Sequence, residues 1–163
     1  RRFVRYEGQC VSYIHAGGTH GVLVKFETTD EVYANAEFEA YGKDVAMQVA
    51  AVNPTYLCKA DVAPEVLEKE KEILMQQAIN EGKPANIAEK MVMGRIAKFY
   101  KENCLIEQAF VKDDKQSITD YTNATAKELG GDIKVVAFTR FEKGEGIEKK
   151  EDNFAEEIAS MTK

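Results

Sequence analysis

The chain has 163 residues, of which 44% are hydrophobic and 31% are charged, and its formal net charge is −6 at neutral pH. This length and composition are typical of a globular domain that buries its own core. The negative charge disfavours direct binding of nucleic acid. No apolar run reaches the roughly 18 residues of a membrane-spanning helix. We therefore expect the chain to bind neither nucleic acid nor a membrane.

The first predicted elements are β-strands. Residues 3–6 predict the end of a strand, and the β-rich runs 11–14 and 21–26 predict two more. Between these runs lies His15-Ala16-Gly17-Gly18-Thr19-His20, whose paired glycines favour a tight turn. The two runs therefore predict a hairpin that leaves His15 exposed.

A helix follows the hairpin. From Phe38 to Val52 the apolar residues recur at helical spacing, and Asn53-Pro54 stops the helix.

A helical hairpin is predicted for residues 63–104. Pro64 suits a first helical turn, Gly82 suits a C-cap, and Asn86 can cap the second helix. So short a link requires the two helices to pack antiparallel. Because each helix carries one narrow apolar stripe among many charges, we expect a coiled coil that projects from the fold.

The last part of the chain mixes loop, helix and strand. Residues 108–114 predict a loop, 118–129 an amphipathic helix and 133–141 a strand, with a final helix from about Asp152. The whole pattern predicts an α+β fold, in which a small antiparallel sheet packs with helices and a helical hairpin protrudes. A short repeat, Arg2–Glu7 against Ala137–Glu142, fits either chance similarity or a duplicated domain whose first copy lies upstream.

The sequence holds no arrangement typical of an enzyme. Its two histidines, His15 and His20, lack the further clustered ligands of a metal site. The cysteines are odd in number and without CxxC spacing, which indicates free thiols in a reducing compartment. We therefore expect no catalytic residues, no metal and no cofactor.

Several stretches carry a further signal because they follow one another in a recognisable order. They are Tyr13 to Gly18 with Gly21 to Val24, Lys43 to Ala51, Asn80 to Pro84, Ala88 to Val92 with Gly94-Arg95, Glu107 to Lys112, and Arg140 to Lys149. Each stretch alone is a weak signal. Together they resemble elongation factor Ts, the family that releases GDP from elongation factor Tu.

The resemblance implies a domain arrangement. Residues 1–62 and 105–142 look like the second of two similar core subdomains, 63–104 like a coiled-coil insertion, and 143–163 like a C-terminal helical module. The family's N-terminal module and first core subdomain have no counterpart in this sequence. We expect either a factor that binds elongation factor Tu and promotes GDP release, or a binding or structural module without exchange activity of its own.

The same resemblance implies a location and contact residues. The setting is a bacterial cytoplasm or an organelle matrix, and a homodimer through the core subdomain is open. His15 matches a family residue that contacts domain 3 of elongation factor Tu, and Val111 and Lys112, with Phe110 beside them, match another contact stretch. The last helix, which carries Phe154 and Ile158, matches one that lies against the partner's GTPase domain. For Phe110 and the last helix, packing on the chain's own core is an equal alternative.

One further stretch bears on exchange itself. Thr29-Asp30-Glu31-Val32 is similar to the Thr-Asp-Phe-Val loop that the family directs toward the partner's magnesium site, but Glu31 replaces the aromatic wedge. Either the stretch is an exchange loop, or it is a loop of the second core subdomain with no part in exchange. We favour the second interpretation.

Overall fold

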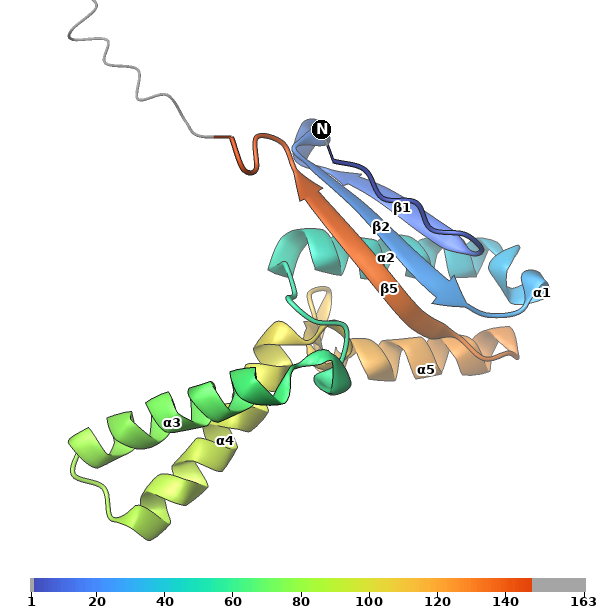
Figure 1. Ribbon diagram of the computed structural model, residues 1–163. Coiled ribbons are helices and arrows are strands. Elements are labelled where there is room, and N and C mark those ends of the chain that lie inside the picture. Colours follow the sequence, from blue (N-terminus) through green and yellow to red (C-terminus); the bar gives the residue numbers. More distant parts are fainter. Residues whose placement is uncertain (1, 148–163) are drawn as a thin grey trace, which may run out of the picture.

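A computed structural model describes residues 2–147, and the expected last helix, with Phe154 and Ile158, lies outside these residues. The fold is α+β, as predicted, with a small antiparallel sheet, helices packed on it and a helical hairpin that extends away (Figure 1). Within the described residues no helix is both long enough and apolar enough to cross a bilayer. The predicted division into core, insertion and C-terminal module stays a prediction.

The main sheet has three antiparallel strands in the order β1-β2-β5, which span Cys10–His15, His20–Glu27 and Lys134–Glu142. The predicted hairpin is β1 and β2, and its connection is the tight turn Ala16–Gly18, in which all three residues have positive φ. The register places Val24 opposite Phe138, so apolar residues gather on one face of the sheet.

The prediction of a strand at residues 3–6 is wrong. Gly8, at φ 91°, turns the chain just before β1, and residues 2–7 join no β-ladder. They contact the sheet through side chains, because the Tyr6 hydroxyl lies 2.7 Å from Thr139 Oγ1. Figure 1 shows this segment crossing the face of the sheet opposite to α2.

The core forms where α2 (Ala36–Val52) lies against the sheet. Its Asn35 N-cap accepts a hydrogen bond from the Glu37 N–H, and Asn53 ends the helix in the left-handed conformation. The fully buried residues of this contact come from both elements and include Val24, Phe26, Phe38, Tyr41, Val45 and Val49.

A second helix, α5 (Ile118–Leu129), packs on α2. Ser117 and Asp120 form a capping box at its start, and Gly130 ends it at φ 70°. The Tyr41 hydroxyl of α2 lies 2.8 Å from Thr122 Oγ1 of α5, so a buried hydrogen bond ties the two helices together. Before α5, the short strands β3 (Ala109–Phe110) and β4 (Asp113–Ser117) form a small hairpin of their own.

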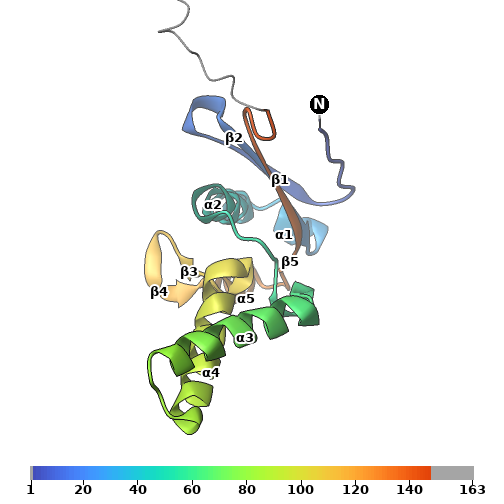
Figure 2. The ribbon, with the colours of Figure 1, turned by 60° about the vertical axis from the view of Figure 1, so that its left-hand side comes forward.

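The helical hairpin consists of α3 (Pro64–Asn80) and α4 (Ala85–Asn103), which pack antiparallel and extend away from the sheet (Figure 2). Pro64 and Gly82 lie where predicted, with Gly82 at φ 75° just after α3. Asn86 does not cap α4, since the helix already begins at Ala85 after Pro84.

The seam of this hairpin is thin. Its buried residues are small or short, namely Ala78, Ala88 and Val92, whereas Val66 and Ile73 are exposed. The coiled-coil geometry therefore stays a prediction, although the antiparallel hairpin is present.

One glycine decides how closely α2 approaches the sheet. A Cβ at Gly42 would lie 2.6 Å from Val11 Cγ2, a distance that real Cβ atoms do not reach. Because Val11 is buried within β1, the extra methyl group would force the helix and strand apart.

We expect Gly42→Ala to lower the free energy of unfolding by about 1–3 kcal/mol, measured by urea denaturation. Gly94→Ala is the matched control, because Gly94 also lies within a helix but a methyl group there would meet no neighbouring atom within 4 Å. There, better helix propensity should raise stability by roughly 0.5–1 kcal/mol. Equal stability of Gly42→Ala and the unmodified chain would contradict the close contact.

Candidate partner-binding site

The predicted contact loop is held by a buried glutamine of α2. The side chain of Gln48 is fully buried, and its Oε1 accepts a hydrogen bond from the Val111 N–H at 2.9 Å. Its Nε2 donates to the Ala109 carbonyl at 3.0 Å and to Gln108 Oε1 at 3.2 Å. The backbone on both sides of Phe110 is therefore bound to one side chain.

With the loop held in this way, two of the predicted contact residues, Phe110 and Val111, differ in their exposure to solvent. Phe110 is buried, and its ring stacks on Tyr121 with centroids 4.5 Å apart and planes 13° from parallel. Val111, the next residue, is 46% exposed. The structure thus places Phe110 in the core, as one of the two alternatives had it, and leaves Val111 at the surface.

Lys112 is ion-paired in the free chain. Its Nζ lies 2.6 Å from Oδ1 of Asp44, and the Tyr121 hydroxyl donates to the other carboxylate oxygen at 3.1 Å. Burial, with the nearby Asp44 charge as a smaller cause, raises the pKa of Tyr121 to about 12. The Tyr121 hydroxyl therefore stays a donor at neutral pH.

His15 lies at the opposite end of β1 from α1 and is less exposed than expected. It forms the last pair of the β1–β2 ladder with His20, and its side chain is half-buried. Its Nδ1 lies 3.1 Å from the Tyr13 hydroxyl, and the two imidazole rings are 6.1 Å apart. His20 instead faces Glu142, with 3.4 Å between Nε2 and the carboxylate.

The stretch Thr29-Asp30-Glu31-Val32 is not an open loop. It forms α1 (Asp30–Tyr33), in which Thr29 Oγ1 accepts a hydrogen bond from the Val32 N–H at 3.3 Å. A threonine N-cap followed by two acidic residues favours a helical start, which explains the difference from the prediction. Asp30 accepts a hydrogen bond from Gln9, Val32 is buried, and Glu31 is exposed.

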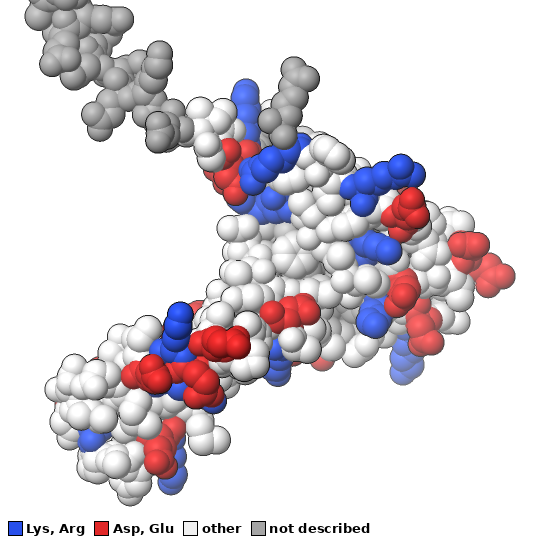
Figure 3. All heavy atoms as spheres, viewed as in Figure 1, with Lys and Arg blue, Asp and Glu red and all other residues white. Residues whose placement is uncertain are grey.

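These placements give separate surfaces rather than one pocket. α1 and the β1–β2 turn lie at opposite ends of the sheet (Figure 1). Because β2 alone has eight residues, the two ends are roughly 25 Å apart. The fold therefore leaves the predicted site residues of the described part in three separate groups: the turn with His15, the stretch Thr29 to Val32 in α1, and the loop with Phe110, Val111 and Lys112. In Figure 3, acidic and basic side chains are interspersed over the visible face.

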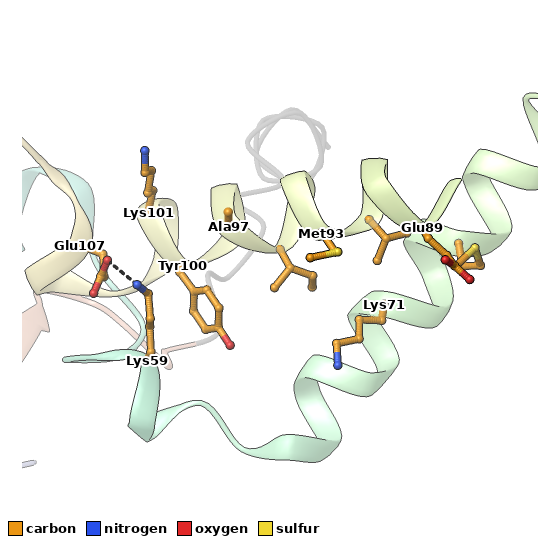
Figure 4. A pocket seen from close by; sticks show the side chains of 11 residues that line it. Lys59, Lys71, Glu89, Met93, Ala97, Tyr100, Lys101 and Glu107 are labelled. Atoms are coloured by element: carbon orange, nitrogen blue, oxygen red, sulfur yellow. Dashed lines mark ion pairs between the residues drawn. The ribbon is translucent and has the colours of Figure 1, made fainter. Parts of the chain in front are cut away.

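An apolar groove on the hairpin was not predicted. It has a volume of about 690 Å³ and is lined mainly by α4, through Val92, Met93, Ile96 and Tyr100, with Met75 from α3 (Figure 4). At one end, Lys59 pairs with Glu107 at 2.9 Å and lies over the Tyr100 ring. The sequence did contain a signal for this groove, because α4 carries more apolar residues than its narrow contact with α3 requires.

Comparison with known proteins gives the family. A family model described as Elongation factor TS matches residues 1–145. Elongation factor Ts of Clostridium botulinum is 57% identical over 152 residues, which cover 93% of this chain and 48% of that relative. Elongation factor Ts of Clostridium kluyveri is 55% identical over 161 residues, or 97% of this chain and 52% of the relative.

The residues matched by the family model include both the sheet and the helical hairpin, so the similarity to an elongation factor extends through nearly all of the described fold. More narrowly, the chain belongs to the elongation factor Ts family, as the ordered motifs indicated. The chain spans about half the length of the curated relatives it matches.

The raised pKa of Tyr121 gives a test of the Tyr121–Asp44 contact. The folded-state pKa of about 12 lies above the unfolded value of about 10. The stability linked to this group is therefore fully present below about pH 10 and is lost as the pH rises toward 12. We expect the difference in unfolding free energy between the unmodified chain and Tyr121→Phe to shrink over that window in urea titrations.

Tyr33→Phe is the control for this measurement, because Tyr33 also donates a hydroxyl hydrogen bond but is 37% exposed. This variant shows how the loss of a more exposed hydroxyl changes the unfolding free energy over the same pH range. If the difference in unfolding free energy between the unmodified chain and Tyr121→Phe stays constant from about pH 8 to 12, folding does not raise the pKa of Tyr121.

Proposed function

We propose that this chain is the partner-binding part of an elongation factor Ts, which binds elongation factor Tu and promotes the release of its GDP. The observation that carries the proposal is the exposed Val111 beside the ion-paired Lys112, in a stretch that resembles a contact stretch of the family. The setting would be the bacterial cytoplasm, where elongation factor Tu works.

The proposed activity requires binding surfaces and no catalytic side chain. A factor that binds the nucleotide-free partner more tightly than the GDP-bound partner weakens GDP binding by the same ratio. In this chain the surfaces would be the Val111 loop and the turn that carries His15. Neither surface needs a metal or a cofactor for this role.

Binding and exchange are separable in this proposal. The only stretch that resembles an exchange loop is folded into α1, with Val32 buried and the aromatic wedge replaced by Glu31. Contacts made equally to GDP-bound and empty partner give affinity without release. We therefore propose strong binding and weak exchange, the alternative being a structural module with no exchange activity at all.

The outer face of the sheet supports a second contact. Ile14, on the face opposite α2, is 67% exposed, and residues 2–7 cross only part of that face. An exposed isoleucine on the open face of a sheet suits contact with another sheet. We propose that it packs against a second copy of this chain or against the other core subdomain of a longer factor.

We expect His15→Ala to weaken binding to elongation factor Tu about tenfold, measured by calorimetric titration, because an interface side chain of this size is lost. His20→Ala is the matched control, since His20 lies opposite His15 in the same ladder but faces Glu142. If both variants bind as the unmodified chain does, the turn is not a contact. If both weaken equally, the loss comes from the turn's structure.

We expect this chain to accelerate GDP release much less than a full-length relative does. Stopped-flow measurement of fluorescent GDP leaving elongation factor Tu tests this directly, at concentrations of the chain that saturate binding. Equal release rates for the two proteins would refute the weak-exchange proposal. In that event Asp30 and Glu31, the polar residues of α1, would be the first to substitute.

A further inference from the structure

We propose that Gln48 is a positioning residue for the partner contact, because it fixes the loop Ala109 to Lys112 in its binding conformation before the partner arrives. The inference rests on the proposed function, in which this loop contacts elongation factor Tu. It adds a buried residue of α2, which touches no partner, to the determinants of affinity.

The first step is the cost of placing an amide at this position. Gln48 is fully buried beside Val45 and Val49 in the core. A buried polar side chain destabilises a core unless its donors and acceptors are satisfied. Here Oε1 has one partner and Nε2 has two, and two of these three groups belong to the backbone of the loop.

The second step concerns which side chain of the loop these hydrogen bonds turn into the fold and which they leave at the surface. The Ala109 carbonyl and the Val111 N–H flank Phe110, so one amide holds the backbone immediately before and after that residue. With the backbone fixed there, the Phe110 ring stacks on Tyr121 inside the fold and Val111 is left at the surface. Rotation of this segment would replace the valine at the contact with an aromatic residue.

The third step is a second attachment from the same helix. Asp44 lies four residues before Gln48, hence one helical turn away on the same side of α2. Its carboxylate is mostly shielded from solvent and binds Lys112 Nζ. Val111 is therefore held between two α2 side chains, one on its own N–H and one on its neighbour's ammonium.

This geometry defines the chemistry of the surface that it fits. Val111 offers a small, β-branched apolar group, and Lys112 retains ammonium donors beyond the one directed at Asp44. The matching partner surface is an apolar depression with a hydrogen-bond acceptor at its edge. Because the loop is already ordered, its binding entails less loss of conformational freedom.

The test compares Gln48→Met with the unmodified chain. Methionine keeps an unbranched side chain of similar length but cannot bind the loop backbone. We expect amide hydrogen exchange at Val111 to become faster while α5 stays protected, and affinity for elongation factor Tu to fall about tenfold in calorimetric titration.

Two further variants separate positioning from general destabilisation. Val24→Ala creates a cavity in the sheet, so it lowers stability without touching the loop, and we expect its affinity to be unchanged. Val111→Ala should weaken binding in the unmodified chain and weaken it less in Gln48→Met, because the two residues act on one contact.

The outcomes distinguish this inference from the function on which it rests. If the unmodified chain fails to bind elongation factor Tu, the proposed function is wrong and the partner role of Gln48 falls with it. If the chain binds but Gln48→Met leaves exchange at Val111 unchanged, the positioning role is wrong. The role is equally wrong if Val24→Ala loses as much affinity as Gln48→Met, or if the effects of Gln48→Met and Val111→Ala simply add.

Discussion

The close contact between α2 and the sheet is the constraint on which both the core and the candidate site depend. Gly42 permits it, because any side chain there would meet Val11. From this position α2 also reaches the loop after α4, through Asp44 and Gln48. A helix displaced from the sheet would carry both of these side chains with it. The packing of the core and the position of the contact loop therefore both depend on where α2 lies against the sheet.

Elements that depend on local chemistry were predictable from the sequence. Paired glycines between β-rich runs gave the β1–β2 hairpin, and Pro64 and Gly82 marked the ends of α3. The predictions that failed depended on neighbours. Residues 3–6 have strand-like composition but pair with no strand, because Gly8 turns the chain before β1. Asn86 could have capped a helix, but that helix begins before it.

The candidate site was predictable only in part, because its geometry is set by residues far away in the sequence. Nothing local to Phe110 and Val111 shows which of them is buried. That choice depends on Gln48, which is 63 residues before Val111. The helical form of Thr29 to Val32, in contrast, could have been predicted from its threonine and acidic residues, but both interpretations of the stretch treated it as a loop.

In the proposed function, the way these surfaces are built separates affinity from discrimination between nucleotide states. The Val111 loop and the His15 turn are both fixed within the free chain, the first by buried hydrogen bonds and the second by the end of a β-ladder. Rigid surfaces of this kind give affinity with little loss of conformational freedom. Release of a nucleotide requires more, namely a contact that is better in the empty state of the partner. α1 is poorly suited to supply it, since Val32 is anchored in the core and Asp30 is bound to Gln9. In a factor made of this chain and a further half, that discrimination would fall to the other half.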